Sequence, residues 1–194
     1  KAVANVCQQS LLIADMPYQS YNNAQQTLDN AQRLMAAGAQ MVKFEGGAEH
    51  EASFKILQAH NIPVCAHLGL QPQSVIKMGG YKVQGKDEKS ANRIIKDALL
   101  LESLGVEVLV LECVPAKLAK RVSEALSIPT IGIGAGVDCD GQVLVSYDML
   151  GINIGRVPKF VKNFLTGHDS IEAATQAFIT AVKTQSFPTQ EQSY

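Results

Sequence analysis

The feature that most constrains the fold is a regular alternation between short apolar runs and longer amphipathic stretches. The apolar runs predict β-strands at residues 11–15, 41–45, 63–67, 108–112, 129–134 and 142–145. The amphipathic stretches predict helices at 24–37, 49–60, 88–104, 115–126 and 171–183. A strand–helix–strand order at this spacing is typical of βαβ units. The strands are almost entirely apolar, as expected where a parallel sheet is buried on both faces.

Local signals mark the ends of these helices. Gly38 and Gly105 follow the first and third predicted helices, in the position that commonly takes a left-handed conformation. Pro115 suits a first helical turn, and Ser170 is a capping residue before the last helix. No change of composition indicates a linker, so we expect residues 1–194 to form a single (β/α) barrel domain.

Composition and charge exclude several classes of protein. A hydrophobic fraction of 46% supports a packed core and excludes intrinsic disorder. Seventeen Lys and Arg against 18 Asp and Glu, without a dense basic cluster, give no reason to expect a nucleic-acid partner. No apolar run approaches the roughly 18 residues of a membrane span, so no membrane partner is expected. The first ten residues do not resemble a signal peptide.

The cysteines indicate a reduced, cytoplasmic protein. They lie far apart, at Cys7, Cys65, Cys113 and Cys139. None forms the closely spaced pair that structural zinc requires, and two lie inside apolar runs, where a thiol behaves as a small hydrophobic group. We therefore expect neither disulfides nor zinc.

Ionisable side chains interrupt the apolar strands at their carboxyl ends. Asp15, Glu45, His67 and Glu112 each close a predicted strand, and Lys43 precedes Glu45 by two positions. Because strand side chains alternate between faces, Lys43 and Glu45 point the same way. In a parallel barrel all these strand ends meet at one rim, where such folds place their active sites.

Each of these residues also has an ordinary structural explanation. An acid at a strand end can cap the next helix, His67 can be a buried and satisfied imidazole, and Lys43 can be a structural ion-pair partner. Together, however, so many ionisable groups are costly to gather unless they hold a metal or a charged substrate. Two carboxylates at one site suit Mg²⁺.

Two further segments are rich in glycine. Residues 131–136 follow a strand but lack the G-x-G-x-x-G order of a dinucleotide site, which favours close backbone packing or a phosphate or pterin contact. Residues 68–87 are long for a connection between a strand and a helix, and we interpret them as an active-site lid. The alternative is an ordinary surface loop.

Taken together, these segments resemble the ketopantoate hydroxymethyltransferase family, of the phosphoenolpyruvate/pyruvate-type TIM-barrel superfamily. The likeness runs in order from about residue 11 to 165. The matching segments are Ala14-Asp15-Met16-Pro17, Met41-Val42-Lys43-Phe44-Glu45-Gly46-Gly47, His67-Leu68-Gly69-Leu70-Gln71-Pro72-Gln73-Ser74, Gly79-Gly80-Tyr81-Lys82-Val83-Gln84-Gly85, Leu109-Val110-Leu111-Glu112-Cys113-Val114-Pro115, Ile131-Gly132-Ile133-Gly134-Ala135-Gly136 and Pro158-Lys159-Phe160.

The resemblance implies the first step of pantothenate biosynthesis, which leads to coenzyme A. A hydroxymethyl group would pass from 5,10-methylenetetrahydrofolate to 3-methyl-2-oxobutanoate, giving 2-dehydropantoate through an enolate stabilised by Mg²⁺. The resemblance implies that Asp15 and Glu45 are Mg²⁺ ligands, that Asp15 and Lys43 bind the keto acid, and that Glu112 is the catalytic base. We assign His67 a supporting role. The family also implies a homo-oligomer, such as a decamer.

The sequence departs from the family in one respect. The family carries an upstream Asp-Ser-Leu-Gly motif that supplies another Mg²⁺ ligand, and nothing here matches it. We therefore expect a TIM (β/α)8 barrel whose first two βα units are absent from this sequence, since a closed barrel typically takes about 250 residues. The expectation for such a chain is weak Mg²⁺ binding and no activity.

Two other interpretations remain open at this point. One is an aldolase that uses Lys43 as a Schiff-base nucleophile, which a lysine at a barrel strand end allows. The other is a truncated barrel that is inactive and serves as an assembly subunit. Borohydride trapping and an assay of turnover distinguish these two from the family's reaction.

Overall fold

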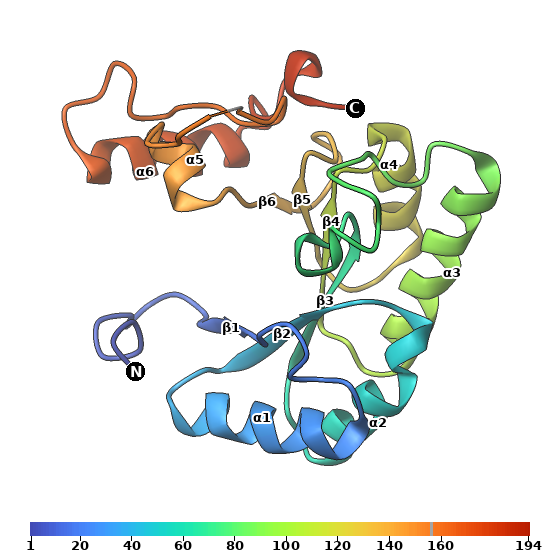
Figure 1. The fold of residues 1–194 in the computed structure, drawn as a ribbon. Coiled ribbons are helices and arrows are strands. Elements are labelled where there is room, and N and C mark those ends of the chain that lie inside the picture. Colours follow the sequence, from blue (N-terminus) through green and yellow to red (C-terminus); the bar gives the residue numbers. More distant parts are fainter. Residues whose placement is uncertain (156) are drawn as a thin grey trace.

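The computed structural model describes residues 1–155 and 157–194, and a six-stranded sheet lies at its centre (Figure 1). The strands follow the sequence order across the sheet, and every neighbouring pair is parallel. Their bounds are β1 Ile13–Asp15, β2 Met41–Glu45, β3 Val64–Gly69, β4 Val108–Glu112, β5 Thr130–Ile133 and β6 Gly141–Gln142. Consecutive parallel strands in sequence order are the arrangement of a (β/α) barrel wall.

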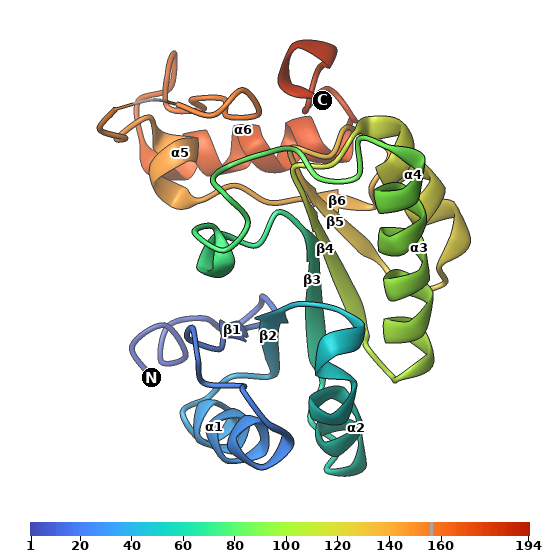
Figure 2. The same ribbon diagram turned by 45° about the vertical axis from the view of Figure 1, so that its right-hand side comes forward.

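Helices separate the first five strands. They are α1 Ala24–Ala36, α2 Glu51–Ala59, α3 Glu88–Ser103 and α4 Ala116–Ala125, with short 3₁₀ turns at Ala48–His50 and Pro72–Ser74. Asn23 and Asp87 cap α1 and α3 by accepting backbone N–H groups, which explains where these helices begin. Figure 2 shows α1 to α4 arranged along one side of the sheet.

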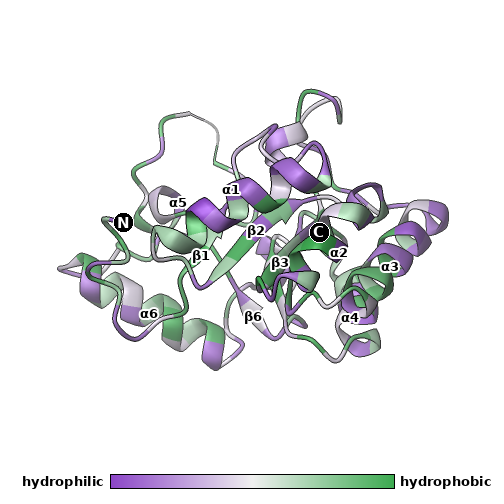
Figure 3. Ribbon diagram, turned by 90° about the horizontal axis from the view of Figure 1, so that it is seen from below, coloured by the Kyte–Doolittle hydropathy of each residue, from purple (hydrophilic) through white to green (hydrophobic). Residues whose placement is uncertain are grey.

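The main core fills the space between the strands and these helices. Val42, Phe44, Ala66, Leu109 and Leu111 face the helices and are fully buried. Alternate residues face the other way and form a second, smaller cluster with Phe160. Figure 3 shows hydrophobic residues gathered on β2 and β3, while α1 is largely hydrophilic. The sheet therefore has a helix-covered outer face and a separate inner face.

The last part of the chain forms a third cluster. Helix α5 spans Ser146–Leu150, α6 spans Ile171–Lys183, and a 3₁₀ turn spans Gln190–Gln192. Phe164, Phe178 and Phe187 pack edge-to-face with ring centroids 5.3 to 5.9 Å apart. These elements lie beyond β6, away from α1 and α2 (Figure 1).

The structure corrects the predicted elements after β5. The strand predicted at 142–145 is limited to Gly141–Gln142, and α5, which the sequence pattern did not predict, begins at Ser146. No helix lies between β5 and β6, where Gly134 and Gly136 adopt positive φ and turn the chain. Leu144 packs against the clusters of the inner face and of α6, whereas Val143 and Val145 are exposed. The predicted alternation of strands and helices is therefore wrong for this part of the chain.

The glycine-rich segment serves close backbone packing. A Cβ added at Gly134 would lie 2.7 Å from the ring of Phe160, and one at Gly136 would lie 2.5 Å from the Cβ of Ala116. Of the two interpretations of this segment, backbone packing is the one that these distances support.

The described residues give two further observations. All four cysteines are free thiols. Over residues 1–155 and 157–194, no helix combines the length and the apolar character needed to cross a membrane. The fold is thus α/β, with a parallel sheet of six strands that forms a half-barrel.

Candidate active site

Strand register brings the ionisable residues of the inner face to one end of the sheet. Asp15 on β1 pairs with Lys43 on β2, and Glu45 pairs with His67 on β3. Gly69, at the end of β3, pairs with Glu112 at the end of β4. Because Val42 and Phe44 face the helices, the alternate residues Lys43 and Glu45 face inward. The alternation of side chains along the strand thus predicted correctly that Lys43 and Glu45 share a face.

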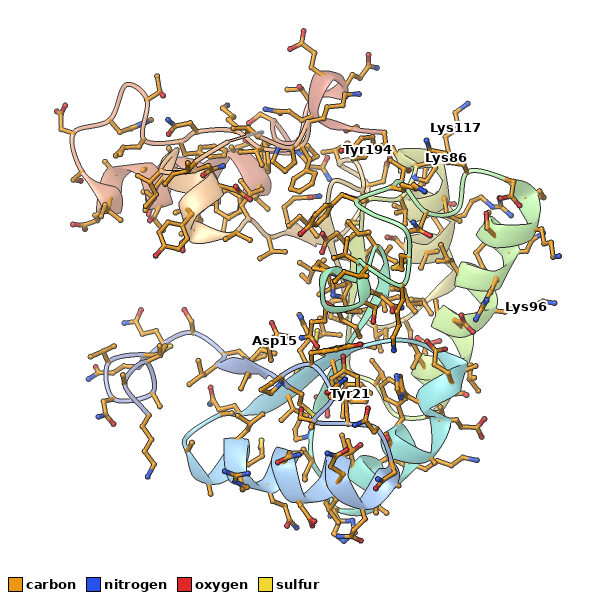
Figure 4. The ribbon with its side chains drawn as sticks, in the orientation of Figure 1. Asp15, Tyr21, Lys86, Lys96, Lys117 and Tyr194 are labelled. Carbon is orange, nitrogen blue, oxygen red and sulfur yellow. The ribbon has the colours of Figure 1, made fainter. Side chains whose placement is uncertain are left out.

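The first group of the site is an ion pair between Asp15 and Lys43. The Lys43 Nζ donates to Oδ1 of Asp15. The lysine side chain is only 19% exposed, whereas the aspartate is 57% exposed. Figure 4 shows Asp15 and Tyr21 on the same part of the molecule, while Lys96 on α3 points away from the sheet. A largely buried ammonium with one open neighbour is suited to bind an anionic ligand.

The second group is a buried row of Glu45, His67 and Glu112. The Nδ1 of His67 lies 3.8 Å from Oε1 of Glu45, and its Nε2 lies 3.2 Å from Oε2 of Glu112. Both ring nitrogens are buried, and neither has an aligned hydrogen bond within the described part of the chain. A buried, unsatisfied imidazole between two carboxylates is costly for a purely structural role. The imidazole has hydrogen-bonding capacity left for a ligand.

Burial dominates the electrostatics of Glu45. Desolvation raises the pKa of its carboxyl, and the neighbouring His67, the N–H of Gln73 and Lys43 oppose this rise in decreasing order. Only 4% of the side chain is exposed. The charge of Glu45 is therefore incompletely compensated in the folded chain, which favours an added cation nearby.

Backbone geometry fixes the position of Glu112. Gly69 has φ +91°, and a Cβ added there would lie 2.2 Å from the carbonyl oxygen of Glu112. The N–H of Leu70 donates to that same oxygen at 2.8 Å. Only glycine allows β3 to approach β4 so closely at this point. The position of Glu112 thus depends on the end of its neighbouring strand.

The cysteines near the site are poor nucleophiles. Burial raises the pKa of Cys65 and of Cys113 to about 12. Thiols are reactive as thiolates, so these two remain protonated and inert at neutral pH. The chemistry therefore rests on the carboxylates, the ammonium and the imidazole.

Two further residues contact this site, Gln73 and Tyr21, and no role was predicted for them from the sequence. Gln73 donates its backbone N–H to both carboxylate oxygens of Glu45, at 3.1 and 3.3 Å. Tyr21 donates its hydroxyl to Oε1 of Gln73 at 2.9 Å. Gln73 lies in a segment that resembles the family, whereas no pattern in the sequence distinguishes Tyr21.

Carboxylates on the inner face are candidate ligands for Mg²⁺. The described residues contain no group of three or more His, Cys, Asp or Glu side chains arranged around a metal position. Asp15 and Glu45 are two carboxylates at neighbouring strand ends, and Mg²⁺ is often held by one or two carboxylates together with waters and substrate oxygens. The residues present fit such a two-carboxylate site.

Solved structures are similar in fold. A candidate phosphonomutase from Burkholderia cenocepacia J2315 matches with a TM-score of 0.51 and 12% identity, over 64% of this chain and 54% of that one. A cyclic α-maltosyl-(1→6)-maltose hydrolase from Arthrobacter globiformis matches with a TM-score of 0.50 and 10% identity, over 90% of this chain and 61% of that one. At such identities the likeness concerns the fold alone.

Curated relatives are far closer in sequence. A 3-methyl-2-oxobutanoate hydroxymethyltransferase from Ruthia magnifica subsp. Calyptogena magnifica is 68% identical over all 194 residues, which cover 75% of that protein. One from Erwinia tasmaniensis is 54% identical over 185 residues, which are 95% of this chain and 70% of the relative. The model of the ketopantoate hydroxymethyltransferase family matches residues 1–190. The chain therefore belongs to the ketopantoate hydroxymethyltransferase family of enzymes.

Proposed function

We propose that this chain transfers a hydroxymethyl group from 5,10-methylenetetrahydrofolate to 3-methyl-2-oxobutanoate, giving 2-dehydropantoate. This proposal replaces the sequence-based expectation of an inactive chain, because the carboxylates of Asp15, Glu45 and Glu112 and the ammonium of Lys43 are all present on one face of the sheet. The observation that carries the proposal is the buried row Glu45–His67–Glu112 beside the Asp15–Lys43 pair, on one face of the sheet. The names of the family and of its relatives support the transferase activity. The roles of individual residues follow from the geometry and from the chemistry of a 2-oxo acid.

In this proposal, Lys43 binds the anionic substrate. A 2-oxo acid carries a carboxylate next to a ketone, and the Lys43 ammonium offers donors that Asp15 does not use completely. Asp15 holds the ammonium in place through their ion pair. A fixed positive charge also stabilises the negative charge that develops on the ketone oxygen when C3 loses its proton.

Asp15 and Glu45 would hold Mg²⁺. When bound, the ion would act as a Lewis acid toward the oxygens of the keto acid. The buried Glu45 carboxylate is oriented by the N–H of Gln73, which leaves lone pairs for a ligand. His67 lies beside the same carboxylate and helps to balance its charge.

Glu112 takes the proton from C3 of the keto acid. The carbanion carbon then bonds to the methylene carbon of the folate as one of the two C–N bonds of that carbon breaks. Water replaces the second folate nitrogen on the same carbon and supplies the hydroxyl oxygen, and tetrahydrofolate leaves with one proton from C3 and one from the water. Glu112 is 9% exposed and ends an apolar strand, so little water competes for its carboxylate. The Nε2 of His67 lies 3.2 Å from Oε2 of Glu112, close enough to limit where that carboxylate can move. A base held in one direction contributes to catalysis through its position as well as its basicity.

The Asp15–Lys43 ion pair argues against the Schiff-base aldolase. That mechanism needs an amine that is free to attack the ketone, whereas the Lys43 Nζ is engaged in an ion pair with the Asp15 carboxylate. No observation in the described structure favours the aldolase over the family's reaction.

Exchange of the C3 proton tests the role of Glu112. Wild-type chain with Mg²⁺ and 3-methyl-2-oxobutanoate in D2O should replace the C3 proton by deuterium, followed by NMR. Glu112→Gln should abolish this exchange and still bind the keto acid, because the base is lost while Lys43 and Glu45 remain. Unchanged exchange in Glu112→Gln would remove Glu112 from this role. Glu124→Gln, on the exposed side of α4, is the matched control and should exchange like wild type.

A further inference from the structure

Gln73 connects three parts of the site. Its backbone N–H donates to the carboxylate of Glu45 on β2. Its side-chain Nε2 donates to the carbonyl oxygen of Met16 at 3.0 Å, and its Oε1 accepts from the hydroxyl of Tyr21 at 2.9 Å. Met16 directly follows Asp15 in the chain. One residue after β3 thereby contacts the segments that carry both proposed metal ligands.

The orientation of the Gln73 amide follows from its partners. A backbone carbonyl only accepts hydrogen bonds, so the NH2 group must face Met16 and the oxygen must face Tyr21. The Tyr21 hydroxyl must then donate, which requires the protonated phenol. Burial, with the nearby Glu45, raises the pKa of Tyr21 to about 12 and keeps it protonated. The direction of each hydrogen bond in this row is therefore fixed.

Tyr21 is itself held rigidly. Its ring is 6% exposed and lies 5.2 Å from the ring of Phe44 and 5.3 Å from that of His50, between centroids. Met16 is fully buried and donates its backbone N–H to the carbonyl oxygen of Lys43 at 2.8 Å. Both partners of the Gln73 side chain are thus anchored to β2, Met16 by a hydrogen bond to Lys43 and Tyr21 by its ring contact with Phe44. Because both of its partners are held rigidly, the Gln73 side chain has little conformational freedom of its own.

From this geometry we infer that Gln73 is a positioning residue for both proposed metal ligands, Asp15 and Glu45. Its backbone orients Glu45, and its side chain holds the segment 16–21, and hence the end of β1, against the segment after β3. Tyr21 completes this by fixing the amide of Gln73. The inference rests on the proposed function for its consequence in binding, but the hydrogen bonds themselves are independent of it.

Three variants separate the parts of this arrangement. Gln73→Ala removes both side-chain hydrogen bonds and leaves the N–H to Glu45. Gln73→Glu keeps the acceptor for Tyr21 and loses the donor to Met16. Tyr21→Phe keeps the ring contacts with Phe44 and His50 and removes only the hydroxyl. Gln25→Ala is the matched control, because Gln25 donates only to the exposed Asp29 on α1 in the described structure.

The first measurement is the dissociation constant of 3-methyl-2-oxobutanoate in the presence of Mg²⁺, by titration calorimetry. Loss of a residue that orients metal ligands commonly weakens binding or activity by about tenfold or more, which is the result expected for Gln73→Ala and Gln73→Glu. Tyr21→Phe should weaken binding by about threefold, the effect of one hydrogen bond. Gln25→Ala should bind like wild type.

The second measurement is amide hydrogen exchange of residues 16–21, which needs neither substrate nor activity. Faster exchange in Gln73→Ala and Tyr21→Phe, with circular dichroism unchanged, is the expected result. Exchange and keto-acid affinity both equal to wild type in a folded Tyr21→Phe and Gln73→Ala would overturn the inference. If Gln73→Ala does not fold, Tyr21→Phe decides the question alone. A wild-type chain that binds no keto acid would contradict the proposed function, and the exchange data would then decide the positioning role.

Discussion

Glu45 is the residue whose environment makes the clearest statement about stability. Burial raises its pKa above the ordinary value of 4.5, so the folded chain holds its proton at a pH where the unfolded chain has released it. Stability therefore falls as the pH rises from the ordinary Glu pKa to the raised one, and the whole loss is present above that window. A buried charge kept at such a cost is typical of a functional site rather than a core.

Glu45→Gln should remove this pH-dependent loss. The substituted side chain carries no charge at any pH, and its amide oxygen still accepts the backbone N–H of Gln73. We expect equal unfolding free energies for variant and wild type near pH 4, and a more stable variant at pH 7, measured by urea unfolding. Glu51→Gln, in an exposed pair with Lys55, is the control. A Glu45→Gln variant less stable than wild type at pH 7 would contradict the account.

Lys43 should not form a covalent adduct. Borohydride added to the chain with 3-methyl-2-oxobutanoate should leave the protein mass unchanged, because the Lys43 Nζ is engaged in an ion pair with the Asp15 carboxylate and is not free to attack the ketone. A reduced adduct mapped to Lys43 by mass spectrometry would instead support the aldolase. Asp15→Asn serves as the comparison, since it removes the charge that holds the ammonium.

At the scale of single residues, sequence reasoning could place charges but not hydrogen bonds. Alternation along β2 was enough to put Lys43 and Glu45 on the same face, because the period of a strand is fixed. The contact between Gln73 and Glu45 joins residues 28 positions apart through a loop whose path no local pattern specifies. Tyr21 has the same difficulty, since its partner lies 52 positions away.

Among the strands, the ends of β3 and β4 together fix the position of Glu112. Their ends touch through Gly69 and the carbonyl oxygen of Glu112, a contact that has no room for a side chain. Gly80, in the loop that follows, also has positive φ but has open space around its Cβ position. Both glycines adopt a left-handed backbone, but only Gly69 also has other atoms close to its Cβ position.

Gly69→Ala should therefore destabilise the chain more than Gly80→Ala. Each variant places a side chain on a left-handed backbone, which costs about 1–3 kcal/mol. Gly69→Ala must also push β3 away from Glu112, and it should slow exchange of the substrate C3 proton. Urea unfolding and the D2O assay measure the two effects. Equal unfolding free energies and equal exchange rates in the two variants would show that the contact at Gly69 does not hold Glu112.

The accuracy of the predicted elements follows the strength of their local signals. Helix α1 was expected within one residue of its observed end, and α6 and the strands β2 and β4 at their observed bounds, because capping residues and apolar runs mark them. The apolar residues at 143–145 predicted a strand, but they form irregular backbone before α5, in which only Leu144 joins the hydrophobic clusters. Short apolar runs do not distinguish these states without tertiary context.

At the scale of the whole molecule, six parallel strands in sequence order gather the site along one end of the sheet. The outer face is committed to the helices, so the inner face is available for polar chemistry (Figure 2). The chain spans about three-quarters of the length of the curated relative from Ruthia magnifica. The residues present place the ammonium of Lys43 and the carboxylates of Asp15, Glu45 and Glu112 on one face of the sheet.

The most direct test of the central claim is the formation of 2-dehydropantoate by this chain. The assay supplies 5,10-methylenetetrahydrofolate, 3-methyl-2-oxobutanoate and Mg²⁺, and it follows the product by mass spectrometry. The account predicts product with wild type, at least about a hundredfold less with Glu112→Gln, the usual loss for a general base, and less after EDTA treatment. Product formation at the same rate in wild type and Glu112→Gln, or no product from wild type above the protein-free background, would contradict it.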